Sequence, residues 1–428
     1  MGAAPIHAGG HDAPAATREP ASGPALTLVT GLFFLWGVAN NLNDILIAHF
    51  RHVFSLTDFQ SGLVQSAFYL GYFCFAIPAA LFMRRFGYKA AVIFGLLLFA
   101  AGALLFWPAS IALSYGSFLA ALFVIASGLA FLETAANPMV PVLGPAETAT
   151  RRLNFAQAFN PAGSIVGIVL GATLILSSGA GAVADARSVR LPYMLIAAVV
   201  LVWALLLALT HLPAAATQRE MREDGGPGGL AAYRALLGRP RYLAGVAAQF
   251  FYVGAQVGIW SFLIRYVGVA LPELSQKQAA GLLTGALFLF MAGRFVGSAL
   301  LTRISGARLM LIFAVIDALL CVIAAALGGW IGVGALLLSS FFMSVMYPTI
   351  FVLALRGLGP LTKPGASLIV MAIIGGAALT AAMGLVSDRT GTIRAAMLVP
   401  ALCFGVIALF ARLHVGDKVT EGAQDAGA

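Results

Sequence analysis

Residues 32–50 read LFFLWGVANNLNDILIAHF, and this stretch decides both the fold and the kind of function to be expected. It has the length and apolarity of a membrane-spanning helix, yet it contains three amides and a carboxylate, at Asn40, Asn41, Asn43 and Asp44. At about 100° per residue, Trp36, Asn40, Asn43 and Asp44 share one face, with Asn41 at its edge. An unsatisfied polar group in hydrocarbon costs several kcal/mol, so this face is expected to line a cavity or to contact partner side chains.

A later stretch repeats the pattern. Residues 128–138 read GLAFLETAANP, with Glu133 and Asn137 one helical turn apart inside an apolar run. Burial of a carboxyl group favours its neutral form, so acids in such positions can take up and release a proton. We interpret these two intramembrane acids, each accompanied by amides, as the main indication of function.

The composition indicates an integral membrane protein. Of 428 residues, 61% are hydrophobic and 10% are charged, whereas soluble domains have about 45–50% and 25%. The apolar runs are about 20 residues long, which is typical of helices and not of barrel strands. The three cysteines lie inside apolar runs and indicate neither disulfides nor a metal site. The net charge of +9 is spread over loops, so no nucleic-acid partner is expected.

The pattern predicts an all-α membrane fold with twelve transmembrane helices in two six-helix halves. The helices are expected near residues 25–50, 59–82, 88–107, 115–140, 153–178, 191–212, 241–267, 277–301, 307–328, 332–357, 364–386 and 393–413. The predicted regions are a disordered cytoplasmic tail at 1–24, helical halves at 25–212 and 241–413, a Gly-rich charged cytoplasmic linker at 213–240 and a cytoplasmic tail at 414–428.

The distribution of basic residues predicts the orientation. An even number of spans puts both termini on one side, and 17 of the 25 Lys and Arg residues fall on that side. Positive residues concentrate on cytoplasmic loops, so both termini are expected in the cytoplasm.

The two halves resemble each other. Residues 78–89 (PAALFMRRFGYK) align with residues 297–308 (GSALLTRISGAR), and both follow the second helix of their half. Phe33 to Gly37 aligns with Phe250 to Gly254 in the same way. Repeated halves are typical of transporters that bind their substrate at the interface between the repeats, near the middle of the membrane.

The short loop with an Arg, a Gly and a basic residue resembles the signature of the major facilitator superfamily, although Met83 and Thr302 stand where an acid is common. Within it, the chain resembles the fucose–galactose–glucose:proton symporter family, most of all the L-fucose permeases. The matching stretches are FLWGVANNLNDILIAHF (34–50), LETAANPMVPVLGP (132–145), RRLNFAQAFNPAGSIVG (151–167) and FFYVGAQVGIWSFLIRY (250–266). The resemblance implies a proton-coupled sugar importer with alternating access, monomeric, in a bacterial inner membrane.

The resemblance also implies roles for single residues. It makes Asp44 the proton-coupling acid and Glu133 a second essential carboxylate. Sugars are bound by amides and carboxylates together with an aromatic surface, and polar helix faces supply both. The candidate sugar-binding residues are Trp36, Asn40, Asn41, Asn43, Glu133, Asn137, Gln157, Asn160, Tyr252, Gln256, Trp260 and Tyr347.

Structural roles remain possible for several of these residues. Asp44 and Glu133 could pair with neighbouring helices, and the asparagines and glutamines could bind helices together. Trp36, Trp260 and Tyr347 could be core or interface aromatics. Arg294, inside an apolar helix, is interpreted as structural, binding carbonyl groups or extending to the cytoplasmic surface.

The expected function is therefore secondary transport of a hexose or 6-deoxyhexose of the L-fucose, D-galactose or D-glucose type, with H⁺ as coupling ion and no cofactor or metal. An enzyme is not expected, because no nucleophile–base pair or cluster of metal ligands occurs at one depth. Two alternatives stay open: a carrier on the same scaffold for another polar solute or coupled to Na⁺, and a sugar sensor that does not transport.

Overall fold

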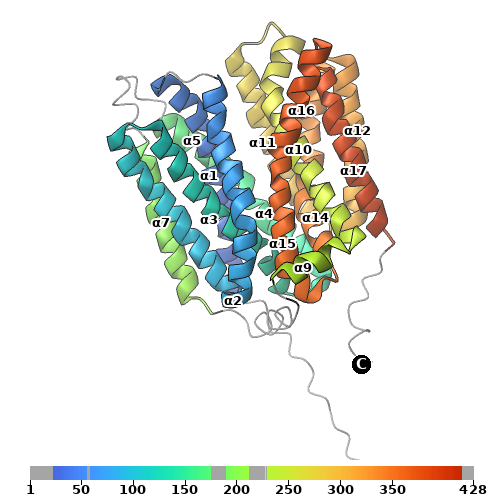
Figure 1. Ribbon diagram of the computed structural model, residues 1–428. Coiled ribbons are helices and arrows are strands. Elements are labelled where there is room, and N and C mark those ends of the chain that lie inside the picture. The colour runs from blue at the N-terminus through green and yellow to red at the C-terminus, as the bar shows by residue number, and fades with distance from the viewer. Residues whose placement is uncertain (1–22, 55–57, 175–188, 212–226, 228, 417–428) are drawn as a thin grey trace, which may run out of the picture.

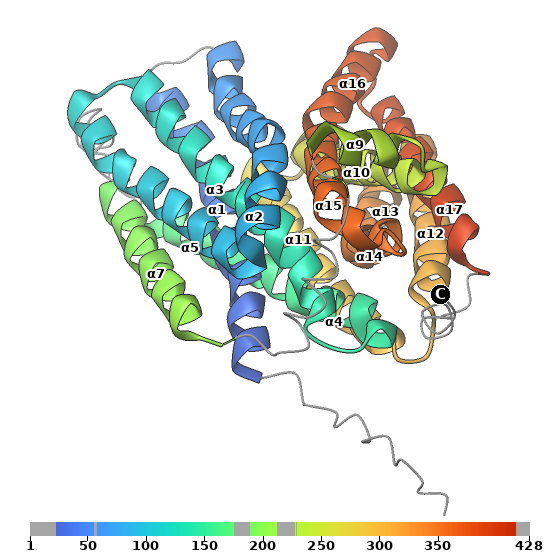
Figure 2. The same ribbon diagram turned by 60° about the horizontal axis from the view of Figure 1, so that its bottom comes forward.

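The computed structural model describes residues 23–54, 58–174, 189–211, 227 and 229–416; side chains at 40–53, 58–66, 146, 168, 171–174, 276 and 277 are not described. Across these ranges the chain is helical and contains no strand. Figure 1 shows two groups of helices side by side, the amino-terminal half in blue to green and the carboxyl-terminal half in yellow to red. Figure 2, seen from the end where α9 lies, shows α4 and α11 meeting between the halves.

The amino-terminal half contains the six predicted crossings. Its elements are α1 (Gly23–Val53), α2 (Asp58–Ala112), α3 (Tyr115–Val142), η1 (Ala146–Thr148), α4 (Ala149–Gln157), α5 (Phe159–Leu174) and α7 (Arg190–Leu209). The long α2 comprises two crossings that meet at Gly87, whose φ of 86° and ψ of 170° are not helical. A glycine adopts this conformation without steric cost, which explains why the chain reverses there.

The carboxyl-terminal half also contains six crossings, so the prediction of a twelve-helix membrane fold is confirmed. Its elements are α10 (Pro240–Ala270), α11 (Gln276–Leu300), α12 (Gly306–Leu327), α13 (Gly329–Phe342), η2 (Met343–Val345), α14 (Met346–Leu355), η3 (Gly359–Leu361), α15 (Thr362–Met371), η4 (Ala372–Ile374), α16 (Gly375–Thr390), η5 (Ala395–Met397) and α17 (Leu398–His414). Short 3₁₀ segments interrupt two of these crossings, and such interruptions often mark functional sites.

The linker between the halves contains a helix that the sequence pattern did not predict. The segment α9 (Gly229–Leu237) has Ala232 and Leu236 on one buried face, one turn apart. The hydroxyl groups of Tyr233 and Ser367 are 3.1 Å apart and form a hydrogen bond to α15. Two apolar residues at helical spacing give this part of the linker a face that packs against the bundle, so a short helix forms there.

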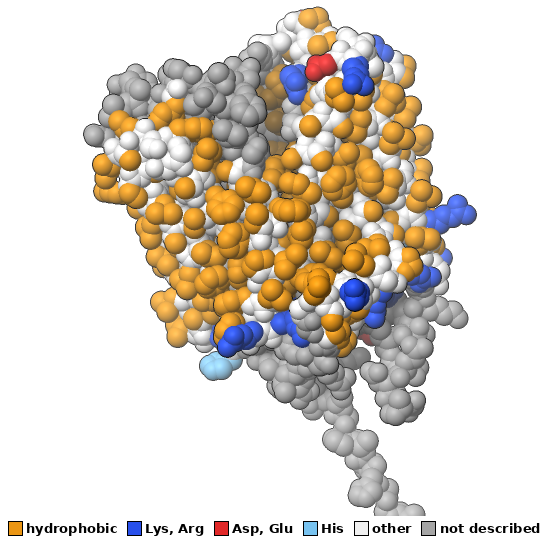
Figure 3. Space-filling model, in the orientation of Figure 1, with side chains coloured by type: hydrophobic (Ala, Val, Ile, Leu, Met, Phe, Trp, Pro, Cys, Tyr) orange, Lys and Arg blue, Asp and Glu red, His pale blue; other side chains and the backbone are white. Residues whose placement is uncertain are grey.

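The outer surface of the bundle suits a lipid environment. Nine helices within the described ranges have the length and apolarity to cross a membrane, and the 46-residue apolar segment of α2 counts once among them. Large apolar side chains such as Leu402 and Leu205 are exposed. Figure 3 shows hydrophobic side chains covering the sides of the molecule, while Lys and Arg lie along its lower edge and, beside an acid, at its upper edge. We call this lower edge, where α9 lies and α17 ends, the terminal end.

Glycines allow α1 and α5 to cross in close contact. A Cβ atom on Gly37 would lie 1.9 Å from the carbonyl oxygen of Asn160, and one on Gly163 would lie 2.0 Å from that of Phe34. The backbones therefore touch, and the amide of Asn160 donates a hydrogen bond of 3.2 Å to the carbonyl of Phe33. This crossing fixes the position of Trp36 relative to α5.

Candidate functional site

A cavity of about 260 Å³ lies between the two halves. It is lined by an acid, a cation, amides, hydroxyls and many aromatic rings, and both halves contribute. The lining residues include Phe33, Trp36, Phe68, Tyr69, Tyr72, Glu133, Gln157, Asn160, Ser164, Gln256, Trp260, Ser261, Phe290, Arg294 and Tyr347. A polar cavity inside an apolar bundle is the feature that the sequence pattern predicted.

The amide side of the cavity is built by a break between α4 and α5. Pro161 has no N–H, so it cannot donate to the carbonyl of Gln157 four residues earlier. Arg294 of α11, in the other half, takes up that free carbonyl: its Nη1 donates to Gln157 O over 2.6 Å and to Gln157 Oε1 over 3.0 Å. The proline therefore creates an acceptor that connects the halves, and the Gln157 side chain is oriented by the same cation.

Gln157 is also held from within its own half. Its Nε2 donates to Asn137 Oδ1 of α3 over 2.8 Å. With Arg294 on its oxygen and Asn137 on its nitrogen, the amide of Gln157 has one orientation at the cavity wall. A fixed amide of this kind can bind hydroxyl groups selectively, because the entropy of ordering it has been lost on folding.

Glu133 is the acid of the cavity. It is 2% exposed, and its Oε1 accepts a hydrogen bond from the hydroxyl of Tyr347, which belongs to the other half. Its Oε2 has no hydrogen-bond partner among the described residues. A buried carboxyl oxygen that lacks a protein partner and faces a cavity is available to a proton or to a ligand hydroxyl.

Aromatic rings form the opposite wall. The indole Nε1 of Trp260 donates to Ser340 Oγ over 3.1 Å, and its ring meets Phe290 edge-on with centroids 5.0 Å apart. The Arg294 guanidinium lies 4.7 Å from the Phe290 ring centroid. On the amino-terminal side, Trp36 stacks on Phe33 with centroids 5.9 Å apart. These contacts hold flat apolar surfaces next to the polar groups.

The predicted site residues fall into three groups. Most line the cavity: Trp36, Glu133, Gln157, Asn160, Gln256, Trp260 and Tyr347. Asn137 and Tyr252 are fully buried behind it, where Asn137 holds Gln157 and the Tyr252 ring lies 6.0 Å from that of Tyr347. The side chains of Asn40, Asn41, Asn43 and Asp44 lie outside the described part of the chain.

Several lining residues were not predicted. Arg294 binds a carbonyl group, which was one of the two structural roles expected for it, and it does not extend to the terminal end. It also lines the cavity, which was not expected. Tyr69 and Tyr72 line the cavity from α2. Their signal in the sequence is weak, because aromatic residues inside apolar helices usually belong to the core.

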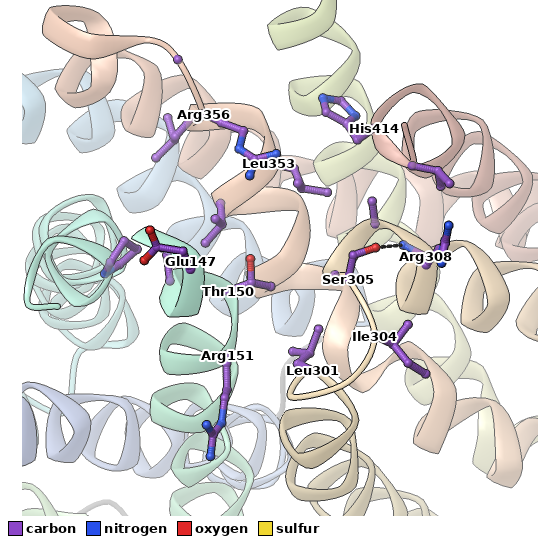
Figure 4. Close-up of a pocket in the computed structure, with 18 of the residues that line it drawn as sticks. Glu147, Thr150, Arg151, Leu301, Ile304, Ser305, Arg308, Leu353, Arg356 and His414 are labelled. Atoms are coloured by element: carbon purple, nitrogen blue, oxygen red, sulfur yellow. Dashed lines mark hydrogen bonds between the residues drawn. The ribbon is translucent and has the colours of Figure 1, made fainter. Parts of the chain in front are cut away.

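A second cavity, of about 900 Å³, opens at the terminal end. Figure 4 shows Arg308 and Ser305 from the start of α12, Arg151 and Thr150 from α4, and Arg356 after α14 around this space. The two cavities lie one above the other. Between them the Asn154 amide of α4 donates to Thr349 Oγ1 of α14 over 3.3 Å.

The halves are also joined closer to the terminal end. Lys363 of α15 is fully buried, and its Nζ donates to the carbonyl of Met83 in α2 over 3.3 Å and lies 5.0 Å from the ring centroid of Tyr88. Met83 is the position where the acid of the loop signature is missing. Its backbone carbonyl accepts a hydrogen bond directly from the Lys363 ammonium group.

Two halves of repeated sequence, a polar cavity at their interface and a bonded layer that closes one end define a secondary transporter. The model of the Major Facilitator Superfamily matches residues 28–362. The chain belongs to this superfamily.

Relatives with assigned activities cover nearly the whole chain. An L-fucose-proton symporter of Escherichia coli strain K12 is 48% identical over 90% of this chain and 92% of its own length. A glucose/galactose transporter of Brucella abortus is 39% identical over 91% and 93%. The crystal structure of a Major Facilitator Superfamily transporter, FucP, in the outward conformation superposes with a TM-score of 0.82 at 46% identity, covering 91% of this chain and 98% of that one. A proton:xylose symporter at 13% identity, with a TM-score of 0.76, shares the fold.

Proposed function

We propose that this protein is a proton-coupled symporter that imports a hexose or a 6-deoxyhexose by alternating access. The observation that carries the proposal is the position of Glu133: it is a buried acid, faces the cavity, and is bonded to Tyr347 of the opposite half. Glu133 can therefore contact the solute and take up the proton. It also takes part in a hydrogen bond between the halves, which must break when they move apart. The similarity to L-fucose-proton and glucose/galactose transporters supports the same activity.

The cavity suits a monosaccharide. Pockets for drug-sized ligands have about 300–1,000 Å³, so about 260 Å³ favours a single sugar ring. The amides of Gln157, Asn160 and Gln256 can bind hydroxyl groups, while the faces of Trp36 and Trp260 can cover C–H surfaces. A carrier of apolar solutes would not need this set of amides.

Coupling follows from what a buried acid requires. An ionised carboxylate in the bundle interior is costly, and protonation removes this cost. Protonated Glu133 can donate a hydrogen bond to a sugar hydroxyl, whereas the ionised form can only accept. We assign the proton relay to Asp44 and Glu133 together. The proton changes the contacts that Glu133 makes in each conformation, and only such differential contacts can shift the equilibrium.

The terminal end is assigned to the cytoplasm and the cavity to the outward-facing state. Of the 25 Lys and Arg residues, 17 fall on the side of the two termini by the sequence, as the positive-inside rule expects of a cytoplasmic face. The cross-half bonds of Asn154 and Lys363 lie between the cavity and this end. The likeness to a transporter in the outward conformation supports this assignment. We propose a monomer in a bacterial inner membrane.

The test is uptake into proteoliposomes. Radiolabelled L-fucose, D-galactose and D-glucose are offered separately under an inward proton gradient, under an inward Na⁺ gradient, and with neither. Accumulation above the outside concentration with the proton gradient alone supports the proposal. Accumulation with Na⁺ alone contradicts proton coupling, and binding without any uptake would indicate a sensor.

A matched pair of variants connects the activity to the site. Asp44→Asn and Glu133→Gln keep the shape of each side chain but cannot lose a proton, so uphill accumulation should be abolished in both. Exchange of labelled for unlabelled sugar needs no net proton movement and should survive in part. Uphill uptake at the normal rate in both variants would remove these acids from the mechanism.

A further inference from the structure

A second carboxyl is buried inside the described bundle and lines neither cavity. Asp317 lies in the middle of α12 and is 0% exposed. Neither of its oxygens has a hydrogen-bond partner among the described residues. Most buried polar atoms in folded proteins have such a partner, so the position requires an explanation.

No described cation forms a hydrogen bond or ion pair with Asp317, and Arg294 interacts with the phenol of Tyr252 instead. The titratable groups close enough to influence it are the thiol of Cys321, one turn along α12, and the phenol of Tyr252 on α10. The thiol of Cys403 on α17 is close to that of Cys321. An ionised carboxylate without a cation at this depth would cost several kcal/mol, and one hydroxyl does not offset that cost. The carboxyl is therefore the neutral acid, with an O–H to donate.

One hydroxyl lies within reach of that O–H. Ser339 on α13 is next to the carboxyl, is fully buried, and its Oγ also has no hydrogen-bond partner in the described part of the chain. Two orphaned groups on adjacent helices can satisfy each other by a small side-chain rotation.

The neighbouring residue on α13 connects this pair to the cavity. Ser340 follows Ser339, and its Oγ accepts the hydrogen bond from Trp260 Nε1. Trp260 lines the cavity and packs edge-on against Phe290. In the same turn of α13, Ser340 therefore holds Trp260 and Ser339 faces Asp317.

We propose that Asp317 is a positioning residue for substrate binding: its neutral carboxyl donates to Ser339 and fixes this turn of α13, so that Ser340 holds Trp260 against the sugar. The inference rests on the proposed function. It assigns Asp317 no part in proton transfer, in contrast to Asp44 and Glu133.

The first test is equilibrium binding of radiolabelled L-fucose, D-galactose and D-glucose to the purified full-length protein in detergent. Asp317→Asn keeps a donor of the same shape and should retain the affinity of the wild type within about twofold. Asp317→Ala removes the donor and should weaken binding about tenfold. Met310→Leu, two turns earlier on the same helix and also fully buried, controls for packing and should change affinity by less than about twofold.

A double-mutant cycle tests the route through α13. Trp260→Phe removes the N–H that Ser340 accepts, so adding Asp317→Ala to it should weaken binding by less than about twofold more. Full additivity of the two effects would overturn the proposal, as would equal losses for Asp317→Asn and Asp317→Ala. If the wild type binds none of the three sugars, the proposed function fails; if it binds and Asp317→Ala binds equally well, only this inference fails.

Two further measurements decide the protonation state, even if Asp317→Ala does not fold. The infrared difference spectrum between wild type and Asp317→Asn should contain the C=O band of a protonated carboxyl, and carboxylate bands would contradict the proposal. Proton-driven uptake by Asp317→Asn should match that of the wild type. Retained binding with loss of uphill uptake would make Asp317 a proton carrier and overturn the positioning role.

Discussion

The hydroxyl of Tyr347 on α14 donates a hydrogen bond to the carboxyl of Glu133 on α3, so the acid of the cavity is bonded directly to the opposite half of the molecule. The bond can form only while the two halves lie close together at this level. Protonation of Glu133 or binding of a sugar hydroxyl to it changes this contact. The protonation and binding state of Glu133 can therefore shift the equilibrium between the relative positions of the two halves.

Tyr347→Phe should weaken closure of the terminal end. The ring is kept, and only the cross-half bond to Glu133 is lost; a hydrogen bond to a charged or partly charged group contributes about 1.5–3 kcal/mol. A reporter cysteine at Ala149, which is only 7% exposed at the wall of the cavity at the terminal end, is introduced in a Cys74→Ser background, since Cys74 is exposed. Maleimide labelling of the reporter should become about tenfold faster.

Tyr252→Phe is the matched control for that experiment. Tyr252 lies next to Tyr347, with ring centroids 6.0 Å apart, but its hydroxyl makes no hydrogen bond across the halves within the described residues. Labelling of the reporter should stay near the rate of the parent protein. Equal acceleration by both phenylalanines would mean that packing, and not the bond to Glu133, keeps the end closed.

Pro161→Ala should lower sugar affinity without lowering stability. Alanine supplies the N–H that proline lacks, so the helix can continue from α4 into α5 and the Gln157 carbonyl is bonded within the helix. Arg294 then loses its 2.6 Å contact to that carbonyl, and we expect a loss of about tenfold in affinity. Removing an interior proline should leave the melting temperature unchanged or higher.

Pro78→Ala is the control for this effect. Pro78 also lies inside a membrane helix, α2, but it is not part of the cavity wall. Sugar affinity should not change in this variant. A Pro161→Ala protein that binds sugar as tightly as the wild type would show that the break between α4 and α5 does not serve the site.

Lys363→Met should open the terminal end. The ammonium group of Lys363 is fully buried and binds the Met83 carbonyl and the face of Tyr88. A hydrogen bond from a charged donor and a cation–π contact together contribute about 2–4 kcal/mol to the closed form. Methionine keeps the apolar stem, so we expect faster labelling of the Ala149→Cys reporter in a chain that still folds.

Arg303→Met provides the comparison, because Arg303 is exposed and also lines the cavity at the terminal end. Loss of a positive charge at that end should by itself change labelling little, since exposed charges are screened. If both variants label alike, general electrostatics at this end, and not the Lys363 contact, governs closure.

The helix periods predicted the fold and much of the cavity. The twelve spans, Glu133 and the face of α4 and α5 that carries Gln157 and Asn160 could be inferred because polar groups in hydrocarbon must face something polar. The helical period predicts the direction in which a side chain points, but not whether that side chain reaches the cavity wall. Asn137 and Tyr252 were expected to bind the sugar because they share helix faces with other candidates, but the structure has them one layer behind the cavity.

Other features depend on contacts between distant parts of the chain, which helix periods do not contain. That Pro161 frees the Gln157 carbonyl can be read from a spacing of four residues, but the partner Arg294 is 137 positions away and belongs to the other half. Asp317 could have been found: it is an acid inside an apolar run, which is the criterion that identified Asp44 and Glu133. Its distance from amides made it less conspicuous than those two.

The most direct test of the account is the proton movement that accompanies the sugar. Proteoliposomes with a pH-sensitive dye in the lumen and no imposed gradient are mixed with L-fucose, D-galactose or D-glucose, and lumenal pH is followed for the wild type and for Glu133→Gln. We expect acidification by wild-type protein with at least one sugar and none with Glu133→Gln. Sugar entry into wild-type vesicles without acidification, or undiminished acidification by Glu133→Gln, would contradict coupling through this acid.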